Sequence, residues 1–145
     1  MRKWAPMDAE ARFCEDKAIT ASGAIQENSA DVILAIGPGA KDGIWAINVT
    51  ALDIASGDEK YDLILQGTND ASFGTAANVV ELARKTFGKG SAFSPNTAAK
   101  DRGVGRYNIP FSNEEAGTTY KNVRMVAVVA GTTPTITVDS WLTIS

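Results

Sequence analysis

Residues 135–144 alternate between two kinds of side chain more regularly than any other part of the chain. One set of alternate positions is mostly apolar: Ile136, Val138, Ser140, Leu142 and Ile144. The other set is mostly polar: Thr135, Thr137, Asp139, Trp141 and Thr143. A period of two is the pattern of a β-strand with one buried face. The segment therefore predicts a strand that lies over a hydrophobic core.

Other short strand-like runs precede this segment and are separated by turn residues. They lie at 31–36, 44–53, 61–65, 78–85, 106–111 and 120–130, with a weaker run near 17–25. Short strands separated by turn signals are typical of a sandwich or barrel. The total is about eight strands, which is the number in a jelly roll. We therefore expect an all-β fold, a jelly-roll-like sandwich of about eight antiparallel strands.

Alternation within these runs assigns side chains to the core. The positions predicted to share an inward face within their strands are Trp45, Ile47, Val49 and Ala51, then Tyr61, Leu63 and Leu65, and then Tyr107, Ile109 and Phe111. The run 120–130 is apolar on both faces, which places it in the middle of a sheet. Residues 77–85 fit a strand or a short helix, and their two valines lead us to predict a strand.

The length of 145 residues suits one domain with a core of its own. Residues 1–17 carry charges of both signs and are predicted to form an N-terminal arm, followed by a single domain over 18–145. The arm either contains a short helix over 7–13 or is extended and ordered on contact. One long connection, 88–105, has no periodicity and is rich in glycine, serine, proline, asparagine and charge. A structureless loop of this length in a compact domain is usually functional or disordered.

The side chains present limit the chemistry. The chain has no histidine, so it has no imidazole base, no Ser–His or Cys–His pair and no histidine zinc ligand. The single Cys14 excludes an internal disulfide, and it is most simply a small apolar contact. Asp58 and Glu59 lie in a predicted turn and Asp62 is predicted to point outward, so they do not form a hydrolase pair. We expect no catalytic residue, cofactor or metal.

Charge and hydropathy also limit the partners. Because the net charge is -3, we expect no nucleic-acid partner. Because the sequence has no long apolar run, we expect no membrane partner. Residues 84–106 are basic, with Arg84, Lys85, Lys89, Lys100, Arg102 and Arg106 against Asp101. Residues 53–70 are acidic, with Asp53, Asp58, Glu59, Asp62 and Asp70 against Lys60. The opposite signs of the two segments have two interpretations. The segments dock electrostatically, on a partner or between copies of the chain, or they form a solvated surface.

Three parts of the sequence carry a resemblance to a known family. They are FCEDKAITAS at 13–22, LQGTNDASF at 65–73, and the C-terminal part from Tyr107 through YKNVRM at 120–125 to the strand 135–144. In these parts the chain resembles the jelly-roll cement proteins, also called decoration or head-stabilising proteins, of tailed bacteriophages. The matching motifs are short and contain no catalytic residues. Residues before Phe13 match no pattern of the family.

The resemblance implies a protein that is made in the host cytoplasm and is added to the outer surface of an icosahedral capsid. There it would be part of the virion, bridge subunits of the major capsid protein and form a homo-oligomer, with a dimer favoured over a trimer. Our hypothesis assigns the contacts to the arm, the basic loop and the outward Trp141. The candidate contact residues are Arg2, Lys3, Trp4, Arg12, Phe13, Lys89, Lys100, Arg102 and Trp141.

Two other functions remain open at this point. One is a carbohydrate- or receptor-binding jelly-roll accessory domain of a phage virion, which would need a concave aromatic platform. The other is a jelly-roll hydrolase, which would need two carboxylates across a cleft. Trp141 itself has two interpretations, because an outward tryptophan either contacts another chain or is covered by a neighbouring part of its own.

Overall fold

The computed structural model describes residues 11–88 and 104–144. Its long strands are β1 (Arg12–Ile19), β6 (Asp42–Leu52), β7 (Lys60–Thr68), β8 (Val80–Gly88), β9 (Gly105–Ser112), β12 (Asn122–Ala130) and β13 (Ile136–Ile144). The short strands are β2 (Gly23–Ala24), β3 (Gln26–Glu27), β4 (Ala30–Asp31), β5 (Leu34–Ala35), β10 (Glu114–Glu115) and β11 (Thr118–Thr119). A 3-10 turn, η2 (Ala76–Asn78), precedes β8.

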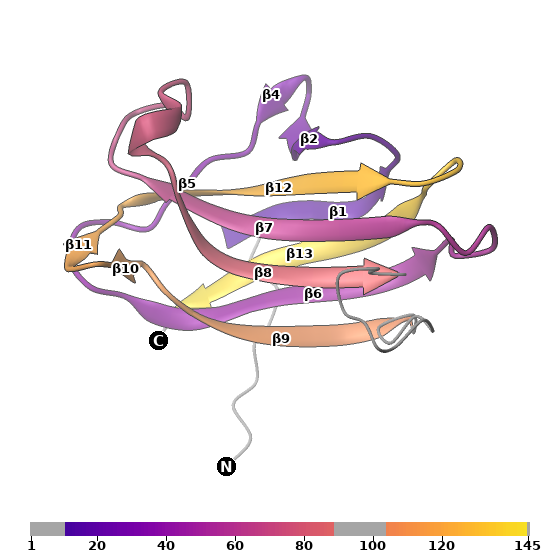
Figure 1. Cartoon of the computed structure of the whole chain (residues 1–145). Helices are drawn as coiled ribbons and strands as arrows, with labels where there is room; N and C mark the ends of the chain where they lie inside the picture. Colours follow the sequence, from indigo (N-terminus) through magenta and orange to yellow (C-terminus); the bar gives the residue numbers. More distant parts are fainter. Residues whose placement is uncertain (1–10, 89–103, 145) are drawn as a thin grey trace, which may run out of the picture.

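The long strands form two antiparallel sheets that face each other (Figure 1). The first sheet has the order β1-β13-β6-β9. The second has the order β2-β12-β7-β8, and β5 pairs with β12 beside β2. Neighbouring strands come from distant parts of the chain, since β1 pairs with β13 and β6 pairs with β9. The predicted all-β sandwich is confirmed.

One hydrophobic core lies between the sheets. Its largest fully buried side chains come from both of them: Phe13, Trp45, Ile47, Tyr61, Leu63, Leu65, Phe87, Met125, Ile136 and Leu142. The inward alternation predicted for 61–65 and for 106–111 is confirmed. In the C-terminal strand it holds from Ile136 to Leu142, while Ile144 is exposed at the end of β13.

The predicted alternation along β6 is wrong at its last residues. Thr137 of β13 lies opposite Ala51, whereas the next residue, Val138, lies opposite Val49, so Thr50 is an extra residue in β6. Such a bulge reverses the direction of the side chains that follow it. Leu52 packs against the core as a result, and Ala51 is exposed.

The N-terminal boundary differs from the prediction. Residues 12–17, which we assigned to an arm, belong to β1, and β1 pairs with β13 from Arg12 onward. Phe13 and Cys14 of this strand are buried, so burial of apolar side chains accompanies the pairing. Of the remaining residues of the predicted arm, Ala11 packs against the core, and residues 1–10 lie outside the described part of the chain. The predicted strand at 31–36 is also divided, because β4 pairs with β3 and β5 pairs with β12.

Two other strand predictions hold. Residues 80–88 form β8, so the ambiguous segment is a strand preceded by the short turn η2. β12 lies inside its sheet, between β7 on one side and the short strands β2 and β5 on the other. Its outer face is open, however, and Val128 there is exposed.

Hydrogen bonds join the turns at one end of the sandwich. The hydroxyl of Tyr61 donates to the carbonyl of Asp53 at 2.6 Å and accepts the N–H of Thr135 at 2.9 Å. The carboxylate of Asp58 accepts the backbone N–H and the hydroxyl of Thr132, and these bonds lower the pKa of Asp58. The turn after β6 is thereby held against the turn between β12 and β13.

Candidate interaction surfaces

Six of the nine candidate contact residues lie outside the described part of the chain: Arg2, Lys3, Trp4, Lys89, Lys100 and Arg102. The described ends of the basic loop can be placed, however. Gly88 pairs with Lys60, and Gly105 pairs with Val49. Both ends therefore adjoin the end of the sandwich where β6 leads into β7 through the acidic turn with Asp53 and Asp58. The two described ends of the basic loop, Gly88 and Gly105, therefore lie at the same end of the sandwich as the acidic turn.

Trp141 lies on the outer face of the first sheet, as predicted, but its ring is covered. It lies opposite Ala46 of β6 on one side and Arg12 of β1 on the other. The guanidinium of Arg106 is 4.9 Å from the centre of its ring, and the residue is only 6% exposed. Of the two interpretations of Trp141, the structure therefore supports cover by a neighbouring part of the same chain, and its assignment as a contact residue is corrected. A side chain from β9 covers Trp141, because the small Ala46 between them leaves room for the contact.

Of the other two described candidates, Arg12 is on the surface and Phe13 is not. The guanidinium of Arg12 forms an ion pair with Glu15 at 2.7 Å. Phe13 is 1% exposed and belongs to the core cluster, so its ring cannot contact a partner. Its assignment as a contact residue is corrected, because neighbouring residues of a strand point to opposite faces and Phe13 points between the sheets.

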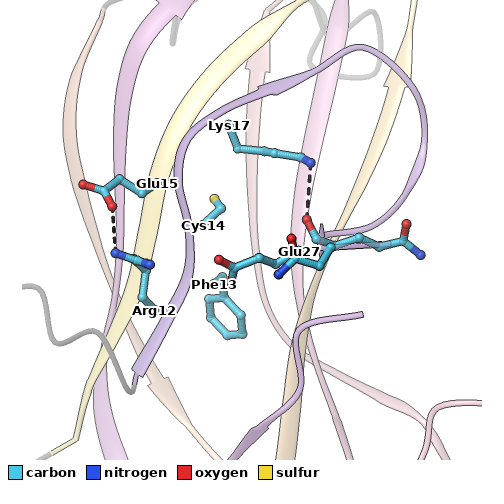
Figure 2. A pocket seen from close by; sticks show the side chains of 8 residues that line it. Arg12, Phe13, Cys14, Glu15, Lys17 and Glu27 are labelled. Carbon is cyan, nitrogen blue, oxygen red and sulfur yellow. Dashed lines mark hydrogen bonds and ion pairs between the residues drawn. The ribbon is translucent and has the colours of Figure 1, made fainter. Parts of the chain in front are cut away.

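A hollow of about 280 Å³ lies between β1 and the β3–β4 hairpin (Figure 2). Its lining residues are Arg12, Phe13, Cys14, Glu15, Lys17, Gln26, Glu27 and Asn28. The ammonium of Lys17 reaches across it and donates to the carbonyl of Gln26 at 3.3 Å. Two cationic and two anionic side chains line it, so their formal charges cancel. The hollow favours no single sign of ligand charge.

Cys14 lies at the inner side of this hollow and is buried, as predicted. Its thiol donates to the carbonyl of Val138 at 3.6 Å. Burial raises the pKa of the thiol from 9.0 to about 12, and the nearby carboxylate of Asp139 adds to the shift. Only the thiolate is a good nucleophile, so Cys14 is unreactive in the folded protein at neutral pH.

We expect this thiol to make folding stability fall at alkaline pH. Its folded-state pKa lies above its ordinary value, so the unfolded chain loses the proton first. The contribution of this thiol to the free energy of unfolding is complete below pH 9. It is lost as the pH rises toward 12, by at most about 1.4 kcal/mol per pH unit. Urea titrations of the wild type and Cys14→Ala at pH 7 and pH 10 should show a smaller difference at pH 10. Equal thiol alkylation rates with and without urea would contradict the burial.

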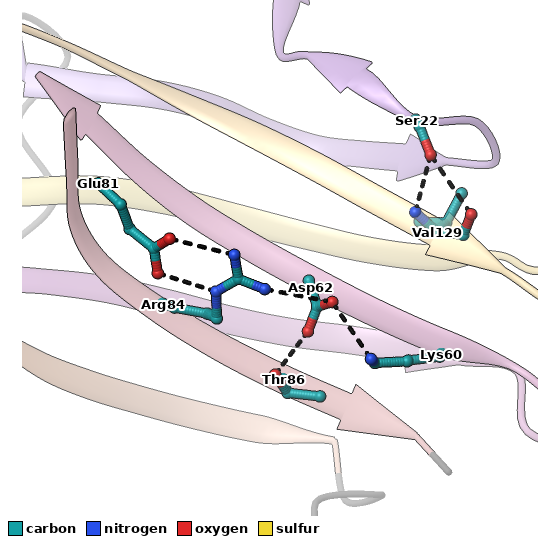
Figure 3. A network of polar contacts seen from close by, with 7 residues as sticks. All are labelled: Ser22, Lys60, Asp62, Glu81, Arg84, Thr86 and Val129. Carbon is teal, nitrogen blue, oxygen red and sulfur yellow. Dashed lines mark hydrogen bonds and ion pairs between the residues drawn. The ribbon is translucent and has the colours of Figure 1, made fainter. Parts of the chain in front are cut away.

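The outer face of the second sheet carries a network of charged side chains (Figure 3). Asp62 lies at its centre, where its carboxylate accepts the Thr86 hydroxyl at 2.5 Å and faces Arg84 at 3.5 Å and Lys60 at 3.6 Å. Asp62 was predicted to point outward, and it does, but it is only 6% exposed because these partners cover it.

Arg84 therefore has structural partners within the same sheet. Its guanidinium also donates two hydrogen bonds to Glu81, at 2.8 and 3.1 Å, and these bonds lower the pKa of Glu81. Arg84 was part of the basic segment considered for docking. Its pairing with Glu81 and Asp62 instead favours a local role on the surface of its own sheet. Exposed ion pairs of this kind order the side chains locally and contribute little to folding stability.

Two buried polar residues were missed by the sequence-based predictions. Glu59 accepts the N–H groups of Ser56 and Asp58, and so holds the predicted turn after β6. Asn113 lies at the other end of the sandwich, where its amide joins two loops. An asparagine followed by two glutamates suggests only an exposed turn, so no local signal could have identified Asn113.

The described residues contain no group of three or more His, Cys, Asp or Glu side chains arranged to hold a metal ion. None of the helical segments within residues 11–88 and 104–144 has the length and apolar character needed to cross a membrane. Comparisons of the chain with protein-family models, curated proteins and solved structures found no match.

Proposed function

We propose that this protein is a non-enzymatic decoration protein that binds the outside of an icosahedral phage head and bridges major capsid subunits. The supporting observation is the strand order. If β2 and β5 count as one broken strand, and the two-residue strands of the separate β3-β4 and β10-β11 pairs are set aside, eight described strands remain in chain order. The first pairs with the eighth, the second with the seventh, the third with the sixth and the fourth with the fifth. This pairing supports the jelly roll that the resemblance implies.

A protein of this size can stabilise a capsid without chemistry. A ligand that binds only the assembled shell stabilises it by mass action, and the effect is repeated at every site. A copy that contacts two subunits gains avidity, because its second contact is intramolecular. Each contact then needs at most a standard interface, about 800 Å² per partner.

The aromatic side chains support this proposal over carbohydrate binding. A sugar-binding face needs exposed rings on which the sugar can stack. Trp45 and Tyr61 are buried in the core, and Trp141 lies beneath Arg106. Phe73 is similarly covered by the guanidinium of Arg124 at 4.4 Å. These rings therefore offer no stacking platform.

Co-sedimentation tests the proposal. The purified protein should sediment with mature heads assembled from the major capsid protein that is encoded with it, and less with unexpanded procapsids. Heads that carry the protein should release their contents at a higher temperature than heads without it. Failure to bind mature heads would contradict the proposal, and binding to a glycan array without head binding would favour the carbohydrate-binding alternative.

Charge reversal tests the assignment of the basic loop. Lys89→Glu, Lys100→Glu and Arg102→Glu are expected to reduce occupancy on heads, because each replaces attraction to an acidic surface by repulsion. Lys121→Glu is the matched control, since Lys121 is exposed near the loop that contains Asn113, at the other end of the sandwich from Gly88 and Gly105. Equal occupancy for all four variants would remove the loop from the proposal.

A further inference from the structure

A hairpin interrupts the strand that pairs with β12 at one side of the second sheet. Ile25 continues the pairing of β2, because its N–H donates to the carbonyl of Met125 at 2.9 Å. The pairing resumes at Leu34, which lies opposite Val123. One residue would be enough to join these two points, but the chain uses residues 26–33. They contain the β3–β4 hairpin, which projects from the sheet beside β12 (Figure 1). The second sheet does not require this hairpin.

The tip of the β3–β4 hairpin has a strained backbone. Asn28 and Ser29 have φ angles of 52° and 65°, which lie in the left-handed region. Two such residues in succession form the tight turn of a hairpin, where glycine is favoured at the second position. Asparagine tolerates this conformation, but serine has no similar preference for it. Strained backbone persists where the surrounding structure holds it, and it is frequent in segments that bind ligands.

Three side-chain contacts hold the base of this hairpin. The amide of Gln26 donates to the carboxylate of Asp31 across the hairpin at 2.9 Å. The guanidinium of Arg124 in β12 pairs with the same carboxylate at 3.1 Å. The ammonium of Lys17 in β1 donates to the carbonyl of Gln26 at 3.3 Å (Figure 2). The hairpin is thereby attached to both sheets, so it would lose little conformational entropy when it binds a partner.

The exposed side chains at the tip can form hydrogen bonds. Glu27, Asn28 and Ser29 are all exposed, and they offer a carboxylate, an amide and a hydroxyl. Within residues 11–88 and 104–144, the carboxylate of Glu27 has no hydrogen-bond or ion-pair partner. Glu27 also lines the hollow between the hairpin and β1, so a donor group of a partner can reach it there. A partner that presents cationic or N–H donor groups fits this tip.

The hairpin lies on the opposite side of the sandwich from the described ends of the basic loop. β1 and β2 are the outermost strands on the side of the hairpin, and β8 and β9 are the outermost strands on the other side. Gly88 belongs to β8, and Gly105 belongs to β9. A protein that bridges two subunits needs two separate contacts, and contacts on opposite sides of the sandwich suit that purpose.

We propose that the β3–β4 hairpin is a second contact with the capsid, and that its tip binds a major capsid subunit at a surface with cationic or N–H donor groups. The carboxylate of Glu27 accepts hydrogen bonds from that surface. This inference rests on the proposed function, because it names the part of this protein that would contact a capsid subunit.

Charge reversal of Glu27 tests the inference. Glu27→Lys should raise the protein concentration needed for half occupancy of mature heads about tenfold, because it removes a charge-assisted hydrogen bond. Glu115→Lys is the matched control. Glu115 is also exposed and also stands directly before a two-residue hairpin tip, in β10–β11. That hairpin connects β9 to β12, and Glu115→Lys should bind heads as the wild type does.

Deletion of residues 27–33 tests the whole hairpin. It leaves Gln26 as the one residue between Ile25 and Leu34, so both of these apolar side chains can keep their inward direction. Circular dichroism shows whether this variant folds, and the folded variant should bind heads as weakly as Glu27→Lys. If it does not fold, the two exposed point variants decide the question.

The binding results distinguish this inference from the proposed function. A wild-type protein that does not bind mature heads contradicts the proposed function. If the wild type binds and Glu27→Lys binds equally well, only the role of the hairpin is overturned. Equal weakening by Glu27→Lys and Glu115→Lys would also overturn that role, because it would reflect the change in net charge alone.

Discussion

Replacement of Asn113 by aspartate is expected to lower the free energy of unfolding by about 3–5 kcal/mol at neutral pH. Asn113 is 0% exposed. Its amide nitrogen donates to the carbonyls of Gly39 at 2.9 Å and Tyr120 at 3.0 Å, and its oxygen accepts the N–H of Lys41 at 2.7 Å. In the variant, a carboxylate oxygen would face two carbonyl oxygens where a donor stood. Urea titration at pH 7, followed by circular dichroism, measures the loss.

The pH dependence of this loss distinguishes charge repulsion from a simple loss of hydrogen bonds. The new carboxyl would be buried against acceptors, so its pKa in the folded state should lie above its usual range. The folded variant then binds a proton more tightly than the unfolded chain, and its deficit should shrink as pH falls through that raised value. Asn113→Ala should show a smaller loss, about 2–3 kcal/mol, that does not change with pH.

Asn108→Asp makes the same chemical change at an exposed position of β9, where the side-chain oxygen already accepts from Arg106. It should leave the free energy of unfolding nearly unchanged. Equal losses at positions 113 and 108 would show that the buried amide does not hold the loops together.

Trp45→Ala should lower the free energy of unfolding by about 3–5 kcal/mol, because it removes the largest side chain of the core. Trp45 is 0% exposed and belongs to the core cluster between the two sheets. Its indole N–H also donates to the hydroxyl of Ser140 at 2.9 Å, which in turn donates to the carbonyl of Ala46 at 3.0 Å. Urea titration of the variant measures the combined loss of packing and of this bond.

A double-mutant cycle separates the two contributions. Ser140→Ala leaves the indole N–H buried without an acceptor, at a cost of about 1–3 kcal/mol. Trp45→Phe removes the donor and some volume. If the hydrogen bond contributes, the double variant should cost less than the sum of the single variants. Strict additivity would mean that Trp45 stabilises the protein by packing alone.

Strand positions could be predicted well where they depend on local spacing. Tyr61, Leu63 and Leu65 face the core as predicted, because the period of two follows from the backbone of a strand. Ala51 was placed on the wrong face because the extra residue in β6 exists only in its pairing with β13. The predicted arm failed at residues 12–17 for a similar reason, since β13 is more than a hundred residues away in the chain.

The candidate surfaces were less predictable than the strands. The burial of Cys14 was expected from its chemistry, and the structure agrees. The cover over Trp141 comes from Arg106, and Asp62 is covered by Lys60, Arg84 and Thr86. These contacts join different strands, so neither the residue type nor its immediate neighbours could predict them.

The sequence by itself determined the all-β class, the side-chain direction in most strands and the lack of histidine chemistry, because these properties depend on composition and on the spacing of adjacent residues. Tertiary structure alone decided which strands pair, where a bulge reverses the alternation, and which polar side chains become buried. Those outcomes depend on contacts between residues such as Lys85 and Tyr107, which meet only when the two sheets pack together.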